Sequence, residues 1–582
     1  MSLSSAIQVG RSALNISQLG IQLAGNNLAN AATPGYSRQI AYLTPLSSNS
    51  GDPRFNAGRG VWVQDIRRQV DSALQARLWT GVSQQASAEQ QYTILAQVEA
   101  TLGELTGKGL GDQLGTFFKT WSERANQTKS SAIVVQQGVQ LAGYMQQMRG
   151  DLLKMRDQID GQVGAAVERA NQLLASVAEL NRQISGAEVA GGSANALRDQ
   201  RDQAVTELSG LLDVTAVEQP GGGMDLLVGS TPILLGTESR GLELKRESVV
   251  TNGIAGIKAT VTVKVDGSEL SVGGGQIGGL LSTRLGAIEE ARTKLDQVAS
   301  QLIFQMNRLH STGANAQGLT DTTGTLGVRL ADRTQAFNSP TNQTFSGLPF
   351  AANNGGFMVN VKDKATGAVT QVRINVDLDG ITNTGAPGTT DDTTPEQVRS
   401  ALDAVGGITA TWSPEGKLRV TADAGFEFSF EDDTSGALAV LGVNSYFAGS
   451  TAGDIAVRQD LVSDPTKLMV GRVVNGTFVE NGNALEFVKL QDTALAGLGG
   501  RSIKQSWADT AQSIGLQAAG AETLAGSTSV VRTSLEQQRS SIAGVNVDEE
   551  SINLLSFQRQ YQAAARVIQV ADELTQALLA IV

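Results

Sequence analysis

The 582-residue sequence predicts an α+β multidomain protein, with terminal coiled-coil helices, a long helical-bundle body and β-rich outer domains inserted into it. Two patterns support this fold class. Apolar residues recur every seven positions at both chain ends and along interior segments, as in helices that pack along other helices. Glycine, threonine, asparagine and aspartate gather between about 221 and 451, where strand-like segments alternate with turns.

The first predicted helix covers residues 3–30. Ile7, Leu14, Ile21 and Leu28 are spaced seven apart. Arg11 is the only charged residue between positions 1 and 37, although 18% of the chain is charged. A lone surface helix normally carries a charged outer face, so this helix is expected to be contacted on several sides.

The last predicted helix covers residues 551–582 and offers a similar surface. Asn546 and Glu549 have the spacing of a capping box, which marks its start. Burial of one apolar helix face against a single partner stabilises the helix by less free energy than the ordering of its backbone costs. The two ends are therefore predicted to pack as a pair inside a polymer of many copies. The predicted assembly interface is Ile7, Leu14, Ile21, Leu28, Leu554, Phe557, Tyr561, Ile568 and Leu578.

Between the ends, helical and strand-like segments follow one another. Residues 35–68 are interpreted as a linker with some extended structure, because they hold several Pro and Gly residues. The predicted helices are 69–102, 112–126, 150–185, 194–212, 279–311, 395–405 and 503–538. The predicted strands are 214–217, 224–228, 233–235, 257–265, 357–361, 369–376, 408–412, 418–422 and 426–430.

This order is nested, so the helical ends bracket a helical body and the body brackets the β segments. Four domains are expected. They are a terminal coiled-coil domain (1–55 and 545–582), a helical body (56–212, 278–320 and 500–544), a β-rich inserted domain (213–277, 321–350 and 450–499) and a second α+β outer domain (351–449).

Composition excludes several classes of function. The net charge is −12 and the pI is near 4.9, which argues against nucleic acid as a partner. The chain has no cysteine, so disulfides and thiol-bound metals are excluded. No apolar run reaches the ~20 residues of a membrane span, and the N-terminus lacks the layout of a cleaved secretory signal.

Two motifs resemble a known family. Residues 27–38 read N-L-A-N-A-A-T-P-G-Y-S-R and resemble the N-terminal signature of bacterial flagellar rod, hook and hook-associated proteins, the axial protein family. Residues 544–550, 554–558 and 561–568 resemble its C-terminal signature. Within this family, residues 36–38 and the chain length indicate a junction protein between hook and filament. The signature residues are Asn27, Asn30, Thr33, Pro34, Gly35, Tyr36, Ser37 and Arg38.

The resemblance implies a structural, non-enzymatic subunit of the motility apparatus, without a cofactor. Its implied partners are further copies of itself, the flagellar hook protein, the second hook–filament junction protein and a cytoplasmic export chaperone on the C-terminal helix. It also implies type III export without a cleaved signal peptide, and hence an extracellular place on the bacterial flagellum.

Three motifs could indicate chemistry. Residues 273–278 match the G-x-G-x-x-G pattern of dinucleotide-binding turns, but a helix follows where a second parallel strand is required. His310 is the only histidine, and without an identifiable carboxylate or nucleophile partner it is expected to be structural. Asp377 and Asp379 resemble a calcium loop, but Gly380 comes two positions early and no glutamate follows at position 12. No catalytic, cofactor-binding or metal-binding residue is predicted.

Alternative functions remain at this point. The chain could be another axial protein, such as the hook protein, which would have a far smaller helical share. It could be a secreted adhesin or enzyme whose activity lies in the middle segment, with the helices as an anchor. A cytoplasmic coiled-coil scaffold, retained inside the cell, is a further alternative.

Overall fold

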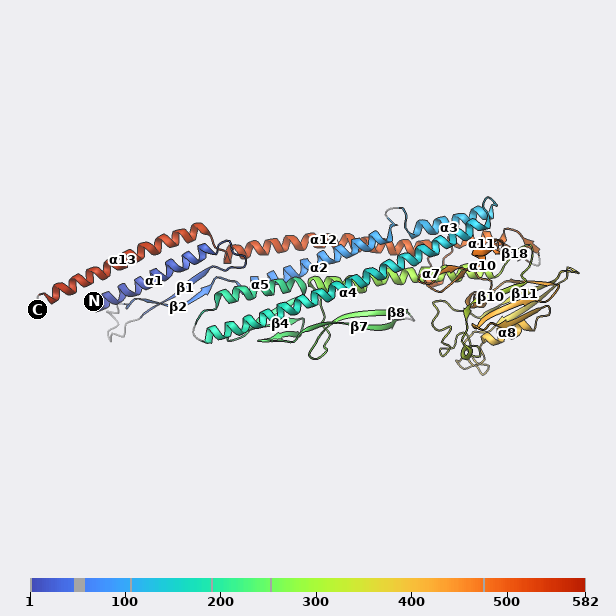
Figure 1. Ribbon diagram of the computed structural model, residues 1–582, viewed down its shortest axis with the longest axis horizontal. Helices are drawn as coiled ribbons and strands as arrows, with labels where there is room; N and C mark the ends of the chain where they lie inside the picture. Colours follow the sequence, from blue (N-terminus) through green and yellow to red (C-terminus); the bar gives the residue numbers. More distant parts are fainter. Residues whose placement is uncertain are drawn as a thin grey trace.

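The computed structural model describes residues 3–46, 58–104, 107–189, 192–251, 254–474 and 477–580. The molecule is elongated, with both chain ends at one tip and a β-rich region at the other (Figure 1). Long helices and small antiparallel sheets confirm the α+β multidomain prediction. Residues 1, 2 and 47–55 of the predicted terminal domain, and residues 581 and 582 at the end of the predicted last helix, lie outside the described residues.

The tip that carries the chain ends consists of two helices and a two-stranded ribbon. They are α1 (Leu3–Ala29), α13 (Val547–Leu579), β1 (Gln39–Pro45) and β2 (Val61–Arg68). α1 packs against α13 and also against the antiparallel β1–β2 ribbon. Asn546 caps α13, since its side chain accepts hydrogen bonds from the N–H groups of Asp548 and Glu549.

Long helices form the body. They are α2 (Ser72–Leu102), α3 (Leu110–Ala125), α4 (Ser131–Val189), α5 (Asn195–Leu211), α6 (Gly275–Thr283), α7 (Glu289–Ser311) and α12 (Ile503–Ala543). The heptad residues Leu152, Ile159, Ala166 and Leu173 of α4 are all buried, so in the body the seven-residue spacing marks an intramolecular core. A π-helical turn, Arg284–Ile288, joins α6 to α7.

Two small sheets flank the body helices. β3 (Val214–Glu218), β4 (Met224–Val228), β5 (Thr231–Leu235) and β6 (Glu238–Ser239) form an antiparallel meander. β7 (Leu242–Thr251) and β8 (Ile254–Val263) form a hairpin. Leu226, Leu234, Leu242 and Val261 join these strands to the core of the body helices.

The outer region at the far tip has its own core. Its elements are β10 (Asp321–Gly327), β11 (Gly355–Asp363), β12 (Val369–Val376), α8 (Pro395–Asp403), β13 (Ile408–Trp412), β14 (Lys417–Ala422), β15 (Phe426–Glu431) and α9 (Ala437–Leu441). The strands form two antiparallel sheets, ordered β10-β14-β13 and β12-β11-β15. Phe357, Phe428 and Phe430 lie in a hydrophobic cluster separate from that of the body.

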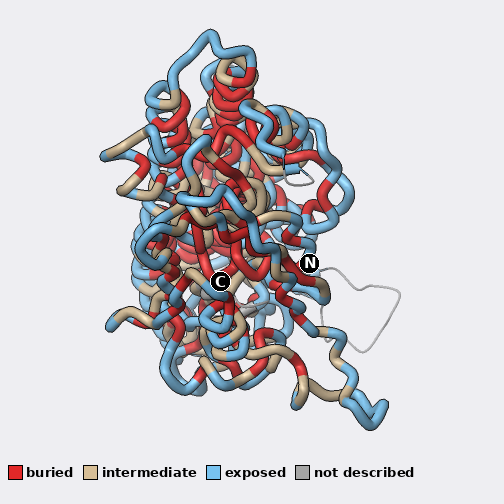
Figure 2. Tube along the Cα trace, turned by 90° about the vertical axis from the view of Figure 1, so that its right-hand side faces the viewer, coloured by how far each residue is buried: buried red, intermediate tan, exposed pale blue. Residues whose placement is uncertain are grey.

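Short elements connect the outer region with the body. They are β9 (Gly313–Ala314), β16 (Phe447–Ala448), β17 (Ala456–Val457), α10 (Gln459–Ser463), β18 (Gly471–Val474), β19 (Thr477–Val479) and α11 (Gly482–Leu490), with 3-10 turns at Leu330–Asp332, Pro465–Lys467 and Ala496–Leu498. Viewed along the molecule, buried segments gather at its centre and exposed segments surround them (Figure 2).

Some elements differ from those that the sequence predicted. α4 begins at Ser131 rather than near 150, because Gly138 obscures the pattern there without breaking the helix. A Cβ at Gly138 would lie 2.1 Å from the Tyr446 hydroxyl oxygen, so this glycine permits close packing. Part of the predicted linker forms the antiparallel β1–β2 ribbon. Its two strands are not adjacent in the sequence, so local sequence patterns do not predict that they pair. β7 was not predicted, because its exposed positions carry charges.

Candidate assembly site at the joined chain ends

α1 and α13 meet along a seam in which glycines face large side chains. A Cβ at Gly20 would lie 2.6 Å from the Phe557 ring, and a Cβ at Gly10 would lie 2.7 Å from Ile568 Cγ1. The helices are therefore antiparallel, since the earlier α1 position meets the later α13 position. Each missing side chain makes room for one from the partner helix, so the two backbones approach closely.

The structure brings the predicted interface residues of both chain ends to this helix pair, with different exposure. Tyr561 and Leu578 are exposed, with 42% and 56% of their surface accessible. The others are partly buried, and they are Ile7, Leu14, Ile21, Leu28, Leu554, Phe557 and Ile568. The fully buried part of the seam consists of small residues that were not assigned to the interface, including Ala24, Ala564 and Ala571.

α13 also carries apolar residues that the described parts of the chain leave exposed. Between 48% and 66% of their surface is accessible, and they are Ile552, Leu555, Val567, Val570, Leu574 and Leu578. Beside them, a groove of about 440 Å³ runs between α1 and α13, lined by Leu3, Ala6, Arg566, Val567, Val570, Ala571 and Leu574. Apolar surface of this extent is typical of an interaction site.

The signature residues lie at the inner end of the helix pair. Asn27 is buried, and its Nδ2 donates to the Gln39 carbonyl at 3.0 Å and to Glu550 Oε2 at 3.2 Å. Its Oδ1 accepts from the Tyr36 hydroxyl at 2.8 Å and from the Gln39 N–H at 3.0 Å. Asn27 therefore holds the turn after α1 against the first turn of α13.

Arg38 completes this arrangement. Its guanidinium lies 2.6 Å from Glu550 Oε1, and the Glu550 side chain is only 4% exposed. A buried carboxylate is stable only when it is paired and hydrogen-bonded, and here the N-terminal segment supplies both the charge and the donors. We call Asn27, Tyr36, Arg38 and Glu550 the terminal latch.

Further contacts tie the terminal latch to the body. The Ser37 N–H donates to Asp199 Oδ2 at 3.2 Å. Arg68 Nη1 lies 2.8 Å from Asp199 Oδ1 and 2.7 Å from Asp202 Oδ2. Burial, together with the charges of Asp199 and Glu550, raises the pKa of Tyr36 to about 12, so its hydroxyl remains a donor at neutral pH.

The other signature residues shape the turn. Asn30 Nδ2 donates to the Asn26 carbonyl, and the Thr33 hydroxyl donates to Asn30 Oδ1 at 3.3 Å. Pro34 is exposed, and Gly35 has a φ of 81°, which glycine adopts without strain. No local pattern indicated that Arg68, Asp199 and Asp202 belong with this signature, because they are far from it along the chain.

The glycine motif at 273–278 serves helix packing. The strand that precedes it, β8, pairs with β7 in antiparallel orientation, and α6 begins at Gly275. A Cβ at Gly275 would lie 2.3 Å from the Leu211 carbonyl carbon, and Gly275 has a φ of 67°. The close approach of α6 to the end of α5 therefore explains this glycine.

His310 is fully buried at the end of α7. Its Nδ1 lies 2.7 Å from the Asn444 carbonyl oxygen, and its Nε2 accepts from the Met469 N–H at 3.2 Å. These partners fit the neutral tautomer with the proton on Nδ1. Burial lowers the pKa of His310 to about 4, so the ring stays neutral and joins three segments of the chain.

Asp377, Asp379 and Asp392 lie together in the outer region, with carboxylate oxygens within 4.8 Å of one another. Asp392 is distant from the first two along the sequence, and the loop between them closes through a Thr393 N–H bond to the Asp377 carbonyl. Asp392 is buried and accepts from Asn338 Nδ2 at 2.7 Å and from the Gly380 N–H at 3.4 Å. The absence of a metal site stays a prediction.

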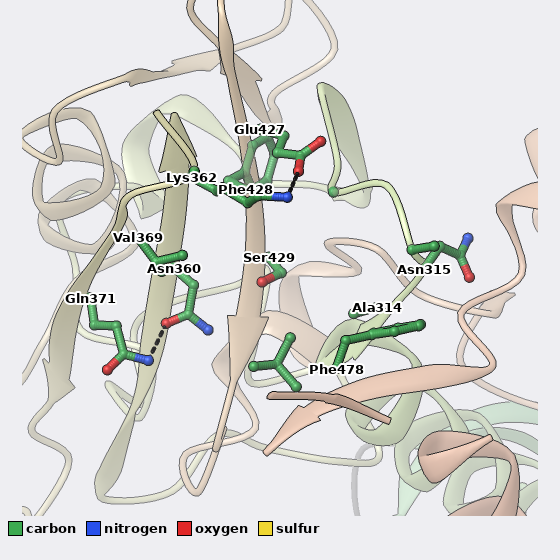
Figure 3. A pocket seen from close by; sticks show the side chains of 14 residues that line it. Ala314, Asn315, Asn360, Lys362, Val369, Gln371, Glu427, Phe428, Ser429 and Phe478 are labelled. Atoms are coloured by element: carbon green, nitrogen blue, oxygen red, sulfur yellow. Dashed lines mark hydrogen bonds and ion pairs between the residues drawn. The ribbon is translucent and has the colours of Figure 1, made fainter. Parts of the chain in front are cut away.

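A cavity of about 380 Å³ lies between the β12-β11-β15 sheet and the β18–β19 hairpin (Figure 3). Lys362 Nζ donates to Glu427 Oε1, and Gln371 Nε2 donates to Asn360 Oδ1, both at 2.9 Å. Phe478 faces these groups from β19. These polar groups therefore pair with one another across the sheet surface.

None of the described helices combines the length and the hydropathy that a bilayer span requires.

Comparison with known proteins gives concordant findings. Residues 95–326 match the family "Flagellar hook-associated protein FlgK helical domain", and residues 536–581 match "Flagellar basal body rod FlgEFG protein C-terminal". The chain is similar to flagellar hook-associated protein 1 of Escherichia coli (strain K12), with 27% identity over 99% of this chain and 100% of that protein. The same-named protein of Bacillus subtilis (strain 168) is 22% identical over 98% and 96%.

A solved structure of the flagellar hook junction protein FlgK from Burkholderia pseudomallei is also similar, at 16% identity. It covers 80% of this chain and 100% of that chain, with a TM-score of 0.48.

Joined helical ends, a helical body and β-rich insertions at the far tip define a structural subunit of the flagellar axis. Within that class, the chain is similar over its full length to flagellar hook-associated protein 1, and this relationship implies a location on the flagellum.

Proposed function

We propose that this chain joins hook to filament, and that it polymerises through its paired terminal helices. The observation that carries the mechanism is the incomplete burial of α13. α13 is already paired with α1, yet Val567, Val570 and Leu574 are 48–53% exposed. Neighbouring copies that covered these residues would gain about 25 cal/mol for each Å² of apolar surface removed from water.

The predicted domain division is kept as part of this proposal. The terminal domain, 1–55 with 545–582, would line the inside of the tube, the helical body would form the next layer, and the two inserted domains would face outward. The placement of the chain ends and the outer region at opposite tips supports this order (Figure 1). Two separate hydrophobic clusters, one in the body and one in the outer region, support separate folding units.

The proposed partners are the hook protein on one side and the second junction protein on the other. A cytoplasmic chaperone would cover the C-terminal helix before type III export, which proceeds without a cleaved signal. The exposed residues of α13 support this partner, since they would promote aggregation in the cytoplasm. The chain is proposed to act without enzymatic activity.

Removal of residues 555–582 tests the assembly mechanism. We expect a folded, soluble and monomeric body that does not join the flagellum, because the body core does not depend on α13. Sedimentation and electron microscopy of flagella from cells that produce only this variant would measure the outcome. Assembly of the truncated chain at the hook tip would contradict the proposal.

Three aspartate substitutions in one turn of α13 separate pairing from assembly. Ile568→Asp places a charge in the seam and should loosen α13 from α1. Val570→Asp places a charge on the exposed apolar face and should leave the monomer folded but unable to assemble. Gln569→Asp, at an exposed polar position, is the matched control and should assemble normally. Cells without assembled junctions should carry hooks but lose their filaments into the medium.

A further inference from the structure

The terminal unit has distinct surfaces on opposite sides of α1. Ser12 marks the side that faces the ribbon, because its hydroxyl accepts from the Val61 N–H at 3.4 Å. Leu3 precedes Ser12 by nine residues, which corresponds to two and a half turns at about 100° per residue, so it points away from the ribbon. Leu3 lines the groove between α1 and α13. The groove and the ribbon therefore lie on opposite sides.

The outer face of the ribbon is aromatic. Trp62 is 52% exposed and Tyr42 is 45% exposed, and the Arg67 guanidinium lies 4.8 Å from the Tyr42 ring centre. Trp62 points away from α1, because its neighbours Val61 and Val63, which alternate with it along the strand, are partly buried. Tryptophan, tyrosine and arginine are the residue types that dominate binding energy at protein interfaces.

We propose that the aromatic ribbon face of one copy occupies the α1–α13 groove of the next copy. This inference rests on the proposed function and specifies its contact. The groove suits an aromatic side chain, since its lining is aliphatic apart from Arg566, whose guanidinium can stack on a ring. Among the described aromatic residues, Trp62 is the most exposed, and it lies at the same tip of the molecule as the groove.

A contact between two different surfaces has a consequence for assembly. Each copy in a chain of contacts keeps a free ribbon at one end and a free groove at the other, so the contact generates a ring or a helix rather than a closed dimer. The ribbon face is about 23 Å long and about 10 Å wide, which is well below the ~800 Å² per partner of a stable interface. Single contacts are therefore weak, and isolated copies stay monomeric until neighbours hold them on both sides.

Cysteine cross-linking tests this pairing, because the chain has no cysteine of its own. Each double variant carries Trp62→Cys together with Val567→Cys, Val570→Cys or Leu574→Cys. Three positions along the groove are tried, because a disulfide forms only when the two Cβ atoms lie about 3.5–4.5 Å apart. Trp62→Cys with Gln569→Cys is the matched control on the polar side of α13. Isolated flagella are oxidised mildly and analysed without reductant.

We expect at least one groove pair to give a ladder of cross-linked multimers, at least ten times more abundant than with the control pair or with either single variant. Flagella that assemble without any such ladder would overturn the inference and leave the proposed function intact. Dimers formed by Trp62→Cys alone would also overturn it, since they would indicate a face-to-face contact.

A second measurement does not depend on disulfide geometry. Trp62→Lys would place a charge in the apolar groove of the next copy, so it should abolish assembly while the purified monomer stays folded. The uncharged variants Trp62→Phe and Trp62→Cys should still assemble. Normal assembly of Trp62→Lys would overturn the inference. That result would not touch the proposed function, which is tested separately by the 555–582 truncation.

Discussion

Glu550 is a carboxylate from the C-terminal helix that is stabilised by groups from the N-terminal segment. Its side chain is 4% exposed and is held by Arg38 and Asn27, more than 500 positions away in the sequence. A charge buried in this way costs several kcal/mol if its partner is missing. The docking of the first turn of α13 is therefore coupled to the placement of the segment after α1.

Replacement of Glu550 by Ala should loosen the docking of α13 by about 1.5–3 kcal/mol, because it removes the hydrogen bonds that this carboxylate accepts from Arg38 and Asn27. Glu549 is the matched control, because it contacts the same Arg38 at 3.5 Å but its side chain is 61% exposed. Glu549→Ala should cost less than about 1 kcal/mol. Amide hydrogen exchange along α13 of the full chain measures both variants, and equal protection in the two would contradict the role of the terminal latch.

His310 predicts a pH dependence of stability. Its pKa is about 4 in the folded protein, whereas an unperturbed histidine has a pKa of 6.5. Between these values the unfolded chain binds a proton that the folded chain does not, so the free energy of unfolding falls as the pH falls from about 6.5 to about 4. The total loss should be about 3 kcal/mol, and above pH 6.5 this group contributes no pH dependence.

The contribution of His310 is separated from that of the carboxylates by subtracting the free energy of unfolding of a variant without it, because His310 is the only histidine. His310→Asn should be less stable than the unchanged chain at pH 7, and the difference should shrink as the pH approaches about 4. Urea unfolding at a series of pH values provides the measurement. A constant difference between pH 7 and pH 4 would show that the buried ring does not resist protonation.

The seam between α1 and α13 depends on glycines at fixed positions. Gly20→Ala places a methyl group 2.6 Å from the Phe557 ring and should destabilise the helix pair by about 1–3 kcal/mol, the usual cost of overpacking. Gly25→Ala is the matched control on the same helix, because beyond its chain neighbours and the adjacent backbone of its own helix no atom lies within 4 Å of the added Cβ. That change should stabilise α1 by up to about 1 kcal/mol.

A second substitution locates the effect of Gly20→Ala. Phe557→Leu removes the ring that the new methyl group meets, so the double variant should lose less stability than the sum of the two single variants. Hydrogen exchange in α1 and α13 reports all four proteins. Additive losses would indicate that Gly20 does not face Phe557.

The sequence predicts elements whose pattern is local and misses arrangements that depend on distant partners. Heptads placed the helices of the body and both ends within a few residues, except where Gly138 obscured the first third of α4. β7 was not predicted, because exposed positions of this two-stranded hairpin carry the charged residues Lys245 and Glu247. The alternation of apolar and polar residues that marks a strand is therefore weak there. The pairing of Arg38 with Glu550 follows only from the fold, although each lies within one of the two family signatures.

In the molecule as a whole, the segments in the middle of the chain lie far from the chain ends. The chain leaves the body after α7 and returns near the same place, because Asn444 donates to the Ser311 carbonyl at 3.3 Å. Everything between these residues lies at the tip opposite the chain ends (Figure 1). The sequence predicted the inserted segments, but it could not predict that the exit and return points meet.

This geometry predicts that the outer region can be removed without loss of assembly. Residues 317–442 would be replaced by a short glycine–serine linker, with Phe304→Ser, because Phe304 packs against the outer core. The variant should remain folded and should assemble, since the terminal latch, the groove and the ribbon all lie outside the deleted segment. Cells that produce it should keep their filaments, unlike cells with the 555–582 truncation. Loss of filaments with His310 still protected from exchange would show that the outer region itself contributes contacts between copies.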